Sequence, residues 1–516
     1  MFDLKLLIKN YFFKKKLTVD VPTAPFKELP DIWLGNQKNG KNILINKNLL
    51  KKINGFDSFN FLRDLKSLGK LETRSIARNI VEIWINRNKN FYSVPFQVMP
   101  LSKRIVNICF TYSWFAKSGN QNFKKKLLTF LSQQLKIQEF KIKSNNKDDE
   151  VFEIYKSLII GNIFLFGNKE KIFQYLKKVD SIINRLILKD GGHVSRNPEK
   201  QLSVLRGLIE IRSATATLPD INNFVLHKNV RLMSKFFKIF CMPDGNLCFF
   251  NGGSLINKLE IAETLKRIDK TSRKTEIADA SGYAKVIKNN MLLLIDLGTK
   301  NNNFSDEKFI NKASIGAFEL YYKKLKLITN LGDIEQNKDF NSLMSLASTA
   351  AHSALSIDDR NNIDLSNNRK LDYLNVKKNI NNLGDLIEIE HSGYKNAFGV
   401  NHKRTIFLKK NGLDFRGIDE IFIVNNSGII PKESKIRFHL SSNLNVFKLR
   451  NGKILLKHSE GLIFYFLSSH DTKIEKTTIF HNNKRYNSKQ IIIYVSLSDI
   501  KDVKIKKCNW SFKFEK

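Results

Sequence analysis

The spacing of apolar residues changes once along this sequence, at about Ser281. From about residue 57 to residue 240 they recur every three to four positions, which is typical of helices that bury one face. After Ser281 apolar and polar residues alternate, which is typical of strands. A helical half followed by a strand half without intervening helices predicts two domains of different class.

The links between the expected elements carry turn residues. Gly119-Asn120 and Gly167-Asn168 separate helical stretches, and such short links favour antiparallel neighbouring helices. Asn411-Gly412 and Asn451-Gly452 lie between strand-like runs, where Asn-Gly supplies the positive φ angles of a two-residue hairpin turn. The expected helices are 74–87, 101–116, 123–137, 151–166, 170–188, 199–217 and 224–240, with a further helical stretch near 255–267, and the clearest strands are 285–287, 318–322, 386–390, 405–408 and 491–495.

These patterns predict an α+β multidomain protein. A chain of 516 residues is longer than one hydrophobic core usually organises. We expect an N-terminal extension over residues 1–56, a domain of paired helices over 57–270 and an antiparallel β-sandwich over 271–516.

The sequence is strongly basic. It contains 87 Lys and Arg against 49 Asp and Glu, a formal net charge of +38, which attracts polyanions such as nucleic acid, anionic membranes and acidic polysaccharides. Lys, Asn and Ile are abundant along the whole chain, so a general compositional drift explains the charge as well as a binding surface does. No helix-turn-helix, zinc-finger or RNA-recognition signature accompanies the charge, and nucleic acid is therefore not the expected partner.

Targeting and redox signals are weak. Charges interrupt every short apolar run in the first ten residues, so this segment does not resemble a signal peptide, and a cytoplasmic location is expected. The most apolar stretch, 158–166, contains Asn162 and is about half the length that spans a bilayer. Four cysteines without CxxC spacing are expected to be buried thiols in a reducing compartment. Nothing in the sequence specifies an oligomeric state.

Four segments carry a family resemblance. They are Asp190–Glu199 (DGGHVSRNPE), Pro243–Leu247 with Phe250–Gly253, Ser314–Leu320 (SIGAFEL) and Ser348–Asp358 (STAAHSALSID). Together they resemble the heparinase II/III-like polysaccharide lyases, most closely the uncharacterised alphaproteobacterial branch. Weaker similarity at 30–33, 61–65, 391–394 and 402–404 extends the resemblance over nearly the whole chain. It implies an incomplete (α/α) toroid and a β-sandwich, with an acidic polysaccharide bound in a cleft between them.

The resemblance also implies a reaction. These lyases cleave uronic-acid chains by β-elimination, which needs a neutralised sugar carboxylate, a base for the C5 proton and an acid for the leaving oxygen. The family's usual acid–base positions are not matched here. The position of its Tyr is Lys200, that of a His is Ile310, and no Asn-His pair precedes the helix around Lys156.

A structural zinc is implied by the family but not by these residues. Its ligand positions read Lys312, Asn330 and His352, a poor zinc set. We expect no metal cofactor, and our hypothesis is that the Lys312 amine replaces the ion.

Ten polar residues remain as site candidates. The catalytic candidates are His193, His352, His391 and Tyr394, and the substrate-binding candidates are Arg196, Glu199, Lys312, His402, Arg404 and His439. Each has a structural alternative. His193 could bond to its own turn, Arg196 and Glu199 could form a local ion pair, and His352 could be a core residue. His391 with Tyr394, or His402 with Arg404, could supply a replacement base and a carboxylate clamp, although residues two apart share a face of any strand.

Two functions are therefore considered. The first is a carbon–oxygen lyase that acts on an acidic, uronic-acid-containing polysaccharide. The second is a catalytically impaired family member that binds an acidic glycan or a cell-envelope polymer. The family would place either protein in the periplasm or cell envelope, whereas the N-terminal sequence favours the cytoplasm.

Overall fold

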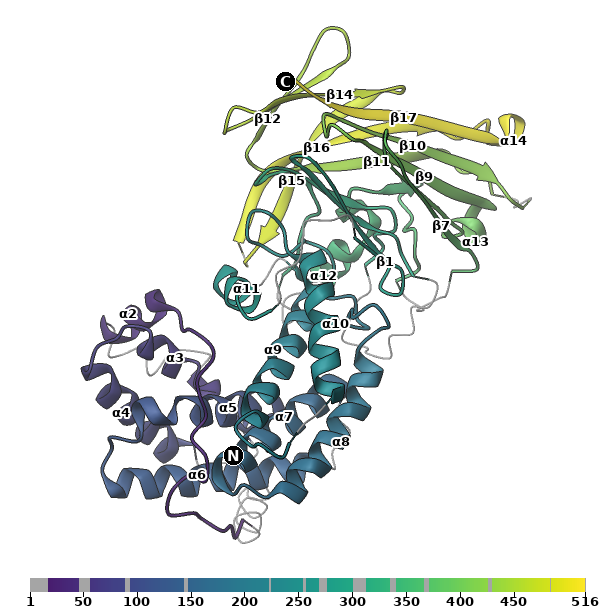
Figure 1. Ribbon diagram of the computed structural model, residues 1–516. Coiled ribbons are helices and arrows are strands. Elements are labelled where there is room, and N and C mark those ends of the chain that lie inside the picture. Colours follow the sequence, from purple (N-terminus) through teal and green to yellow (C-terminus); the bar gives the residue numbers. More distant parts are fainter. Residues whose placement is uncertain are drawn as a thin grey trace, which may run out of the picture. The chain divides into compact units, whose positions relative to one another are not determined.

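The computed structural model divides into two compact units (Figure 1). The helical unit comprises Met1–Ile187 with Ser203–Arg231, and the β unit comprises Leu188–Leu202 with Leu232–Lys516. The residues that the structure describes are 17–45, 56–88, 93–142, 147–221, 224–253, 257–268, 276–299, 312–334, 340–365, 371–425, 429–482 and 484–515. The domain boundary predicted at 270–271, and Ile310, lie outside them, so the boundary stays a prediction.

The helical unit contains helices that the sequence predicts, namely α4 (Glu72–Arg87), α5 (Val98–Phe115), α6 (Gln121–Lys141), α7 (Asp148–Leu165) and α8 (Lys169–Leu186). It also contains helices that were not predicted, α2 (Gln37–Ile45) and α3 (Phe61–Lys66), and short 3-10 turns at Phe56–Ser58 and Val94–Phe96. Helices α9 (Pro198–Thr215) and α10 (Phe224–Phe240) are each divided between the two units.

The Gly-Asn links end one helix and begin the next. Gly167 has φ +63°, a left-handed conformation that glycine adopts without strain and that commonly follows a helix. Asn168 is the N-cap of α8, and its side chain accepts a hydrogen bond from the backbone N–H of Lys171. Asn120 caps α6 in the same way through the N–H of Phe123. These caps explain why the helical period stops and restarts at these two positions.

Helix α7 lies at the centre of the helical unit. It packs against α5, α6 and α8, and every side chain from Phe152 to Leu165 is buried. The apolar stretch at 158–166 therefore belongs to a protein core. None of the helices in the described ranges combines the length and apolarity needed to cross a bilayer.

The β unit contains two antiparallel sheets, which within the described residues have nine and eight strands. The first has the order β1-β2-β3-β4-β5-β11-β16-β15, with β6 also paired to β11, and the second has the order β12-β13-β14-β17-β10-β9-β8-β7. The strands of the first are β1 (Glu276–Ala278), β2 (Tyr283–Lys288), β3 (Met291–Asp296), β4 (Phe318–Tyr322), β5 (Leu325–Thr329), β6 (Leu355–Ile357), β11 (Glu433–Leu440), β15 (Thr472–His481) and β16 (Lys484–Ser496). Those of the second are β7 (Leu374–Ile380), β8 (Gly384–His391), β9 (Val400–Lys409), β10 (Asp414–Ile423), β12 (Leu444–Lys448), β13 (Ile454–His458), β14 (Ile463–Ser468) and β17 (Ile505–Phe514). Short helices α11 (Lys258–Leu265), α12 (Phe340–Ala347), α13 (Lys395–Phe398) and α14 (Ile500–Val503) accompany them.

One apolar core joins the two sheets. Phe318 of β4 stacks on Trp510 of β17 with ring centroids 5.7 Å apart, and both belong to the same buried cluster. The fold class predicted from the sequence, a helical toroid domain followed by a β-sandwich, is confirmed.

The hairpin turns differ from the prediction in one detail. At Asn411-Gly412 and Asn451-Gly452 only the glycine has positive φ, +68° and +81°, so these are not two-residue turns. In the second, Leu449 and Lys453 close a three-residue loop, because Gly452 N–H donates to Leu449 O and Leu449 N–H to Lys453 O. A type I turn followed by a left-handed glycine has this geometry, and it needs only one residue that tolerates positive φ.

Candidate functional site

The ten predicted site residues lie in the β unit, where they form three separate groups. His193, Arg196 and Glu199 belong to the loop before α9. Lys312, His352 and His439 lie near one another around β11. His391, Tyr394, His402 and Arg404 lie in and beside strands β8 and β9.

The segment Leu188–Leu202 is hydrogen-bonded to the turn between the first two strands of the sandwich. The Asp190 carboxylate accepts hydrogen bonds from the N–H and the hydroxyl of Ser281, both 2.7 Å. Gly192 lies so close that a Cβ atom there would be 1.9 Å from Ser281 Oγ. Gly192 of the DGG-H segment is thus required by a close approach between this loop and the turn that joins β1 and β2.

Arg196 completes this attachment. Its side chain is buried, Nε donates to Ser281 O at 2.8 Å, and the guanidinium pairs with Asp296 and stacks 4.6 Å from the centre of the Tyr283 ring. Burial alone would lower the pKa of Arg196, but Asp296 and Tyr283 hold it above its ordinary value. The predicted local ion pair with Glu199 is not the pair that forms; Asp296 takes that place. These contacts, with a further hydrogen bond from the guanidinium to Gly282 O at 3.2 Å, hold the loop against β2, β3 and the turn before β2.

His193 is turned into the same loop. Its Nδ1 accepts from Ser195 N–H at 3.1 Å, which leaves the proton of a neutral ring on Nε2, and its backbone N–H donates to Gln201 Oε1 at 2.6 Å. Gln201 also donates to Gly191 O and is fully buried. Glu199 is half-buried in the first turn of α9, where its N–H bonds to Asn197 Oδ1. Sequence reasoning missed Gln201, which closes the loop.

Lys312 and His352 are buried polar residues of the second group. Lys312 Nζ lies 2.9 Å from Asp333 Oδ2 and donates to Gly332 O at 3.0 Å. His352 is fully buried, and neither ring nitrogen has a hydrogen-bond partner within the described part of the chain. Burial, with the charges of Lys312 and His439 adding to it, lowers the pKa of His352 well below its ordinary value. The imidazole is therefore neutral beside the ammonium.

The zinc that the family resemblance implies does not fit these residues. A protonated Lys312 has no lone pair to donate to a metal ion. The Asn330 side chain is already used at both ends, since its Oδ1 accepts from Ser353 N–H and its Nδ2 donates to Glu319. Over the described ranges, no three His, Cys, Asp or Glu side chains are arranged to hold a metal ion. No zinc site can be built from this set.

The third group is a hydrogen-bonded network inside the sandwich. His391 Nε2 lies 3.0 Å from His402 Nδ1, and His402 Nε2 lies 2.8 Å from Asp419 Oδ1. Asp419 also binds the guanidinium of Arg404 and accepts from Trp510 Nε1 at 2.8 Å. Burial and its neighbouring charges lower the pKa of His391 well below the ordinary value. Although burial alone would raise the pKa of Asp419, Arg404 and His402 hold it below its usual range.

Tyr394 is also enclosed. Its hydroxyl donates to Leu355 O at 2.6 Å, its side chain is fully buried, and burial raises its pKa above the ordinary value. The expectation that His391, Tyr394, His402 and Arg404 line an open groove is corrected by this placement, because each is at most 1% exposed. Residues two apart on β9 do share a face, but that face is the sandwich interior.

The helical unit holds its own buried ion cluster, which sequence reasoning also missed. Lys156 lies 2.8 Å from Glu153 and 3.3 Å from Glu210, and Glu210 accepts from Trp33 Nε1 at 2.9 Å. Arg206 stacks 3.8 Å from the centre of the Trp33 ring. The Pro30–Trp33 segment of the resemblance is therefore held against the helices by side-chain contacts of Trp33.

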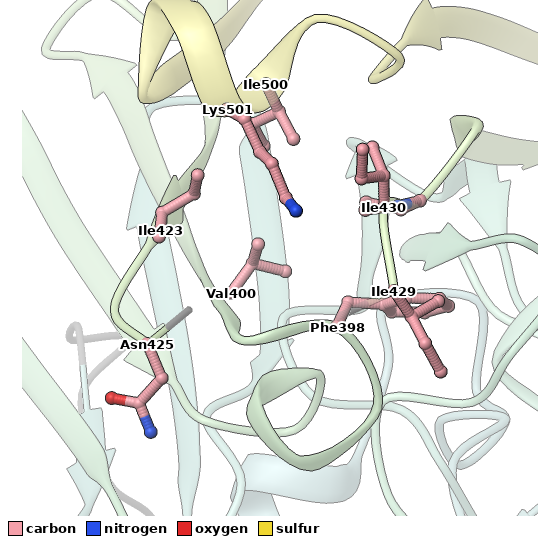
Figure 2. A pocket seen from close by; sticks show the side chains of 9 residues that line it. Phe398, Val400, Ile423, Asn425, Ile429, Ile430, Ile500 and Lys501 are labelled. Carbon is pink, nitrogen blue, oxygen red and sulfur yellow. The ribbon is translucent and has the colours of Figure 1, made fainter. Parts of the chain in front are cut away.

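A small pocket lies elsewhere on the β unit (Figure 2). It is lined mainly by Phe398, Val400, Ile423, Ile429, Ile430 and Ile500, together with Asn425 and Lys501. None of the described residues that line it is an Asp, a Glu or a His, and Lys501 is the ionisable side chain among them.

Comparisons with known proteins agree with this fold. Residues 270–511 match the family model "Heparinase II/III-like, C-terminal". The crystal structure of heparinase III superposes with a TM-score of 0.70 at 13% identity, covering 89% of this chain and 76% of that chain. Heparan sulfate lyase HepC from Pedobacter heparinus superposes with a TM-score of 0.64 at 13% identity, covering 99% of this chain and 88% of that chain. The fold is therefore that of the heparinase III-type lyases.

A curated relative gives a weaker match. FtsZ-localized protein C of Caulobacter vibrioides is 24% identical over 349 residues, which cover 62% of this chain and 58% of that protein. The β unit therefore carries a heparinase II/III-like C-terminal domain, and the chain as a whole shares the fold of heparinase III.

Proposed function

We propose that this protein binds an acidic, uronic-acid-containing polysaccharide without cleaving it. The family fold supports a polysaccharide ligand, and the net charge of +38 supports an anionic one. The observation that carries the proposal is the enclosure of the acid–base candidates, because His352, His391 and Tyr394 are all buried in the β unit.

β-Elimination would need a base that reaches the substrate C5 proton. A candidate base must come within hydrogen-bonding distance of the proton that it removes. His391 is bonded to His402, Tyr394 is bonded to Leu355 O, and His193 accepts from its own loop. Tyr394, whose pKa burial raises, is a weak source of the phenolate that elimination would use. Together with Lys200 at the family's Tyr position, these contacts favour recognition over chemistry.

A lyase acting on the same class of polymer is the second candidate. The match of residues 270–511 to the heparinase II/III-like C-terminal domain favours it, and the superposed heparan sulfate lyase HepC bears that activity in its name. In this version a residue other than the four candidates would take the C5 proton. The polymer would be a cell-envelope or extracellular glycan in either version.

One experiment separates the two. The purified protein is incubated with heparan sulfate, chondroitin sulfate, polygalacturonate and alginate, and with neutral dextran as the control polymer. Ultraviolet absorbance follows the unsaturated product of elimination, and calorimetry follows binding. We expect binding to at least one acidic polymer, weakened by salt, with no product formed. Product formation would establish the lyase, and absence of both signals with every polymer would overturn both candidates.

A further inference from the structure

Strands β15 and β16 form the outermost hairpin of the first sheet, with β15 at the sheet edge (Figure 1, yellow). Toward the turn, Lys476 is paired with Lys489, Thr478 with Asn487 and Phe480 with Arg485. Successive side chains of a strand point to opposite faces, so these six residues share one face. We call them the hairpin face.

The hairpin face carries like charges opposite one another. Lys476 and Lys489 are cross-strand neighbours, and both are exposed, as is Arg485. None of these three cations forms an ion pair with any residue that the structure describes. Like charges directly opposite on a sheet destabilise it. The arrangement therefore opposes folding and is not explained by a contribution to stability.

The second sheet shows the usual alternative. Across β8, β9, β10 and β17, residues Glu390, Lys403, Glu420 and Lys507 lie in register and alternate in sign. Lys507 is 2.6 Å from Glu420, and Lys403 also lies 2.6 Å from Glu388. A uniform excess of lysine along the chain would add lysines to both surfaces. Such an excess does not explain why glutamates alternate with the lysines on the second sheet, whereas none of the described residues between the cations of the hairpin face is acidic.

The remaining groups of the hairpin face suit a sugar chain. Thr478 and Asn487 lie between the two cationic ends and offer neutral donors and acceptors for hydroxyl groups. Arg485 lies 5.7 Å from the centre of the Phe480 ring, which is half-buried and so presents no open ring for stacking a nucleobase. From Lys489 to Arg485 the cations span about 13 Å along the strand, which suits several anionic groups on one chain and not a single small anion.

We propose that the hairpin face binds an acidic polysaccharide through its carboxylate or sulfate groups. This inference rests on the proposed function, because it names the surface that holds the polymer. The lysine pair and Arg485 contact the anionic groups, and Thr478 and Asn487 contact the hydroxyl groups between them.

The test compares two triple variants of the full chain. The first, K476Q/R485Q/K489Q, removes the three cations of the hairpin face. The control, K409Q/K457Q/K513Q, removes three exposed lysines from strands of the second sheet. Affinity for heparan sulfate, polygalacturonate and double-stranded DNA is measured at fixed ionic strength, with thermal unfolding of each variant in parallel.

We expect the first variant to bind the acidic polysaccharide between about tenfold and a hundredfold more weakly than the wild type, and the control to change it by less than about threefold. Thermal stability should not fall, because the substitution removes repulsion between Lys476 and Lys489. Equal losses in both variants would overturn the hairpin site and leave polysaccharide binding intact. If the wild type binds no polysaccharide, the proposed function itself is overturned. If the first variant loses affinity for DNA but not for the polysaccharides, polysaccharide is the wrong partner for the hairpin face.

Discussion

Arg404 and Asp419 form a two-point ion pair inside the sandwich. Arg404 Nε lies 2.7 Å from Asp419 Oδ1 and Nη2 lies 3.1 Å from Oδ2, and both side chains are 1% exposed. The remaining guanidinium nitrogen, Nη1, donates to the backbone oxygens of Gly316 and Ser353, both at 2.9 Å. The pair therefore joins the second sheet to two backbone segments of the family motifs.

Asp419→Asn should unfold the protein more easily, because it leaves the Arg404 charge buried without its counter-charge. Breaking a buried pair from one side costs about 3–5 kcal/mol of unfolding free energy. Asp414→Asn, on the same strand, is the matched control, because its partner Arg416 is 55% exposed and such surface pairs contribute at most about 1 kcal/mol. Urea denaturation measures both variants. If both variants lose the same free energy of unfolding, the buried pair contributes no more to stability than the exposed one, and the prediction is wrong.

Stability should fall as the pH is lowered from 6.5 toward 4. Burial above all lowers the pKa of His439 from 6.5 to about 4 in the folded protein. Between these pH values His439 binds a proton in the unfolded chain but not in the folded one. Acidification therefore lowers the free energy of unfolding by up to about 1.4 kcal/mol per pH unit. Below this window Asp419, whose folded pKa is lowered, adds a further loss. His352 and His391, whose pKa values are also lowered, contribute to the same slope, so His439→Gln should reduce but not abolish the dependence of urea midpoints on pH between 6.5 and 4. An unchanged slope would contradict the assignment.

Arg196→Lys should weaken folding and leave polysaccharide binding intact, because the ammonium cannot keep both the Asp296 pair and the Ser281 contact. In a double-mutant cycle with Asp296→Ala, we expect a coupling free energy of about 1–3 kcal/mol. Affinity is measured well below the melting temperature of each variant. Lost affinity in a variant of normal stability would show instead that Arg196 contacts the polymer.

The protein should hold no stoichiometric zinc. We propose that the Lys312 ammonium, paired with Asp333, supplies the positive charge that the ion would supply in the family. Metal analysis after expression in zinc-supplemented medium should find far less than one ion per chain, and a chelator should leave the melting temperature unchanged. About one tightly held zinc per chain would refute the replacement.

Much of the fold follows from local pattern. Helices α6 and α8 begin where Asn120 and Asn168 provide caps, so the sequence contains both their period and their boundaries. The partner of Arg404 was also accessible. Counting equal steps back from Asn411 and forward from Gly412 places Arg404 of β9 opposite Asp419 of β10, which is the observed register. Arg404 and His402 were site candidates from the sequence, whereas their partner Asp419 was not.

Other features have no local signal. Arg196 and Asp296 are 100 residues apart, and their pairing depends on how a loop meets a sheet. Burial of His391 and Tyr394 depends in the same way on which side of the sheet faces the core. A histidine or tyrosine occupies the same position in a family motif whether its side chain is exposed in a groove or buried beneath it. Sequence therefore indicated the residues that matter and not what they contact.

The division of the chain into units has a consequence for synthesis on the ribosome. Leu188–Leu202 belongs to the β unit, yet Ser203–Arg231 returns to the helical one. Asp190 leaves the ribosome 91 residues before its partner Ser281, so the loop must stay unattached through several seconds of translation. Neither unit can be excised by a single cut, and a fragment that stops before Ser281 would lack the turn against which Gly192 of the DGG-H segment lies.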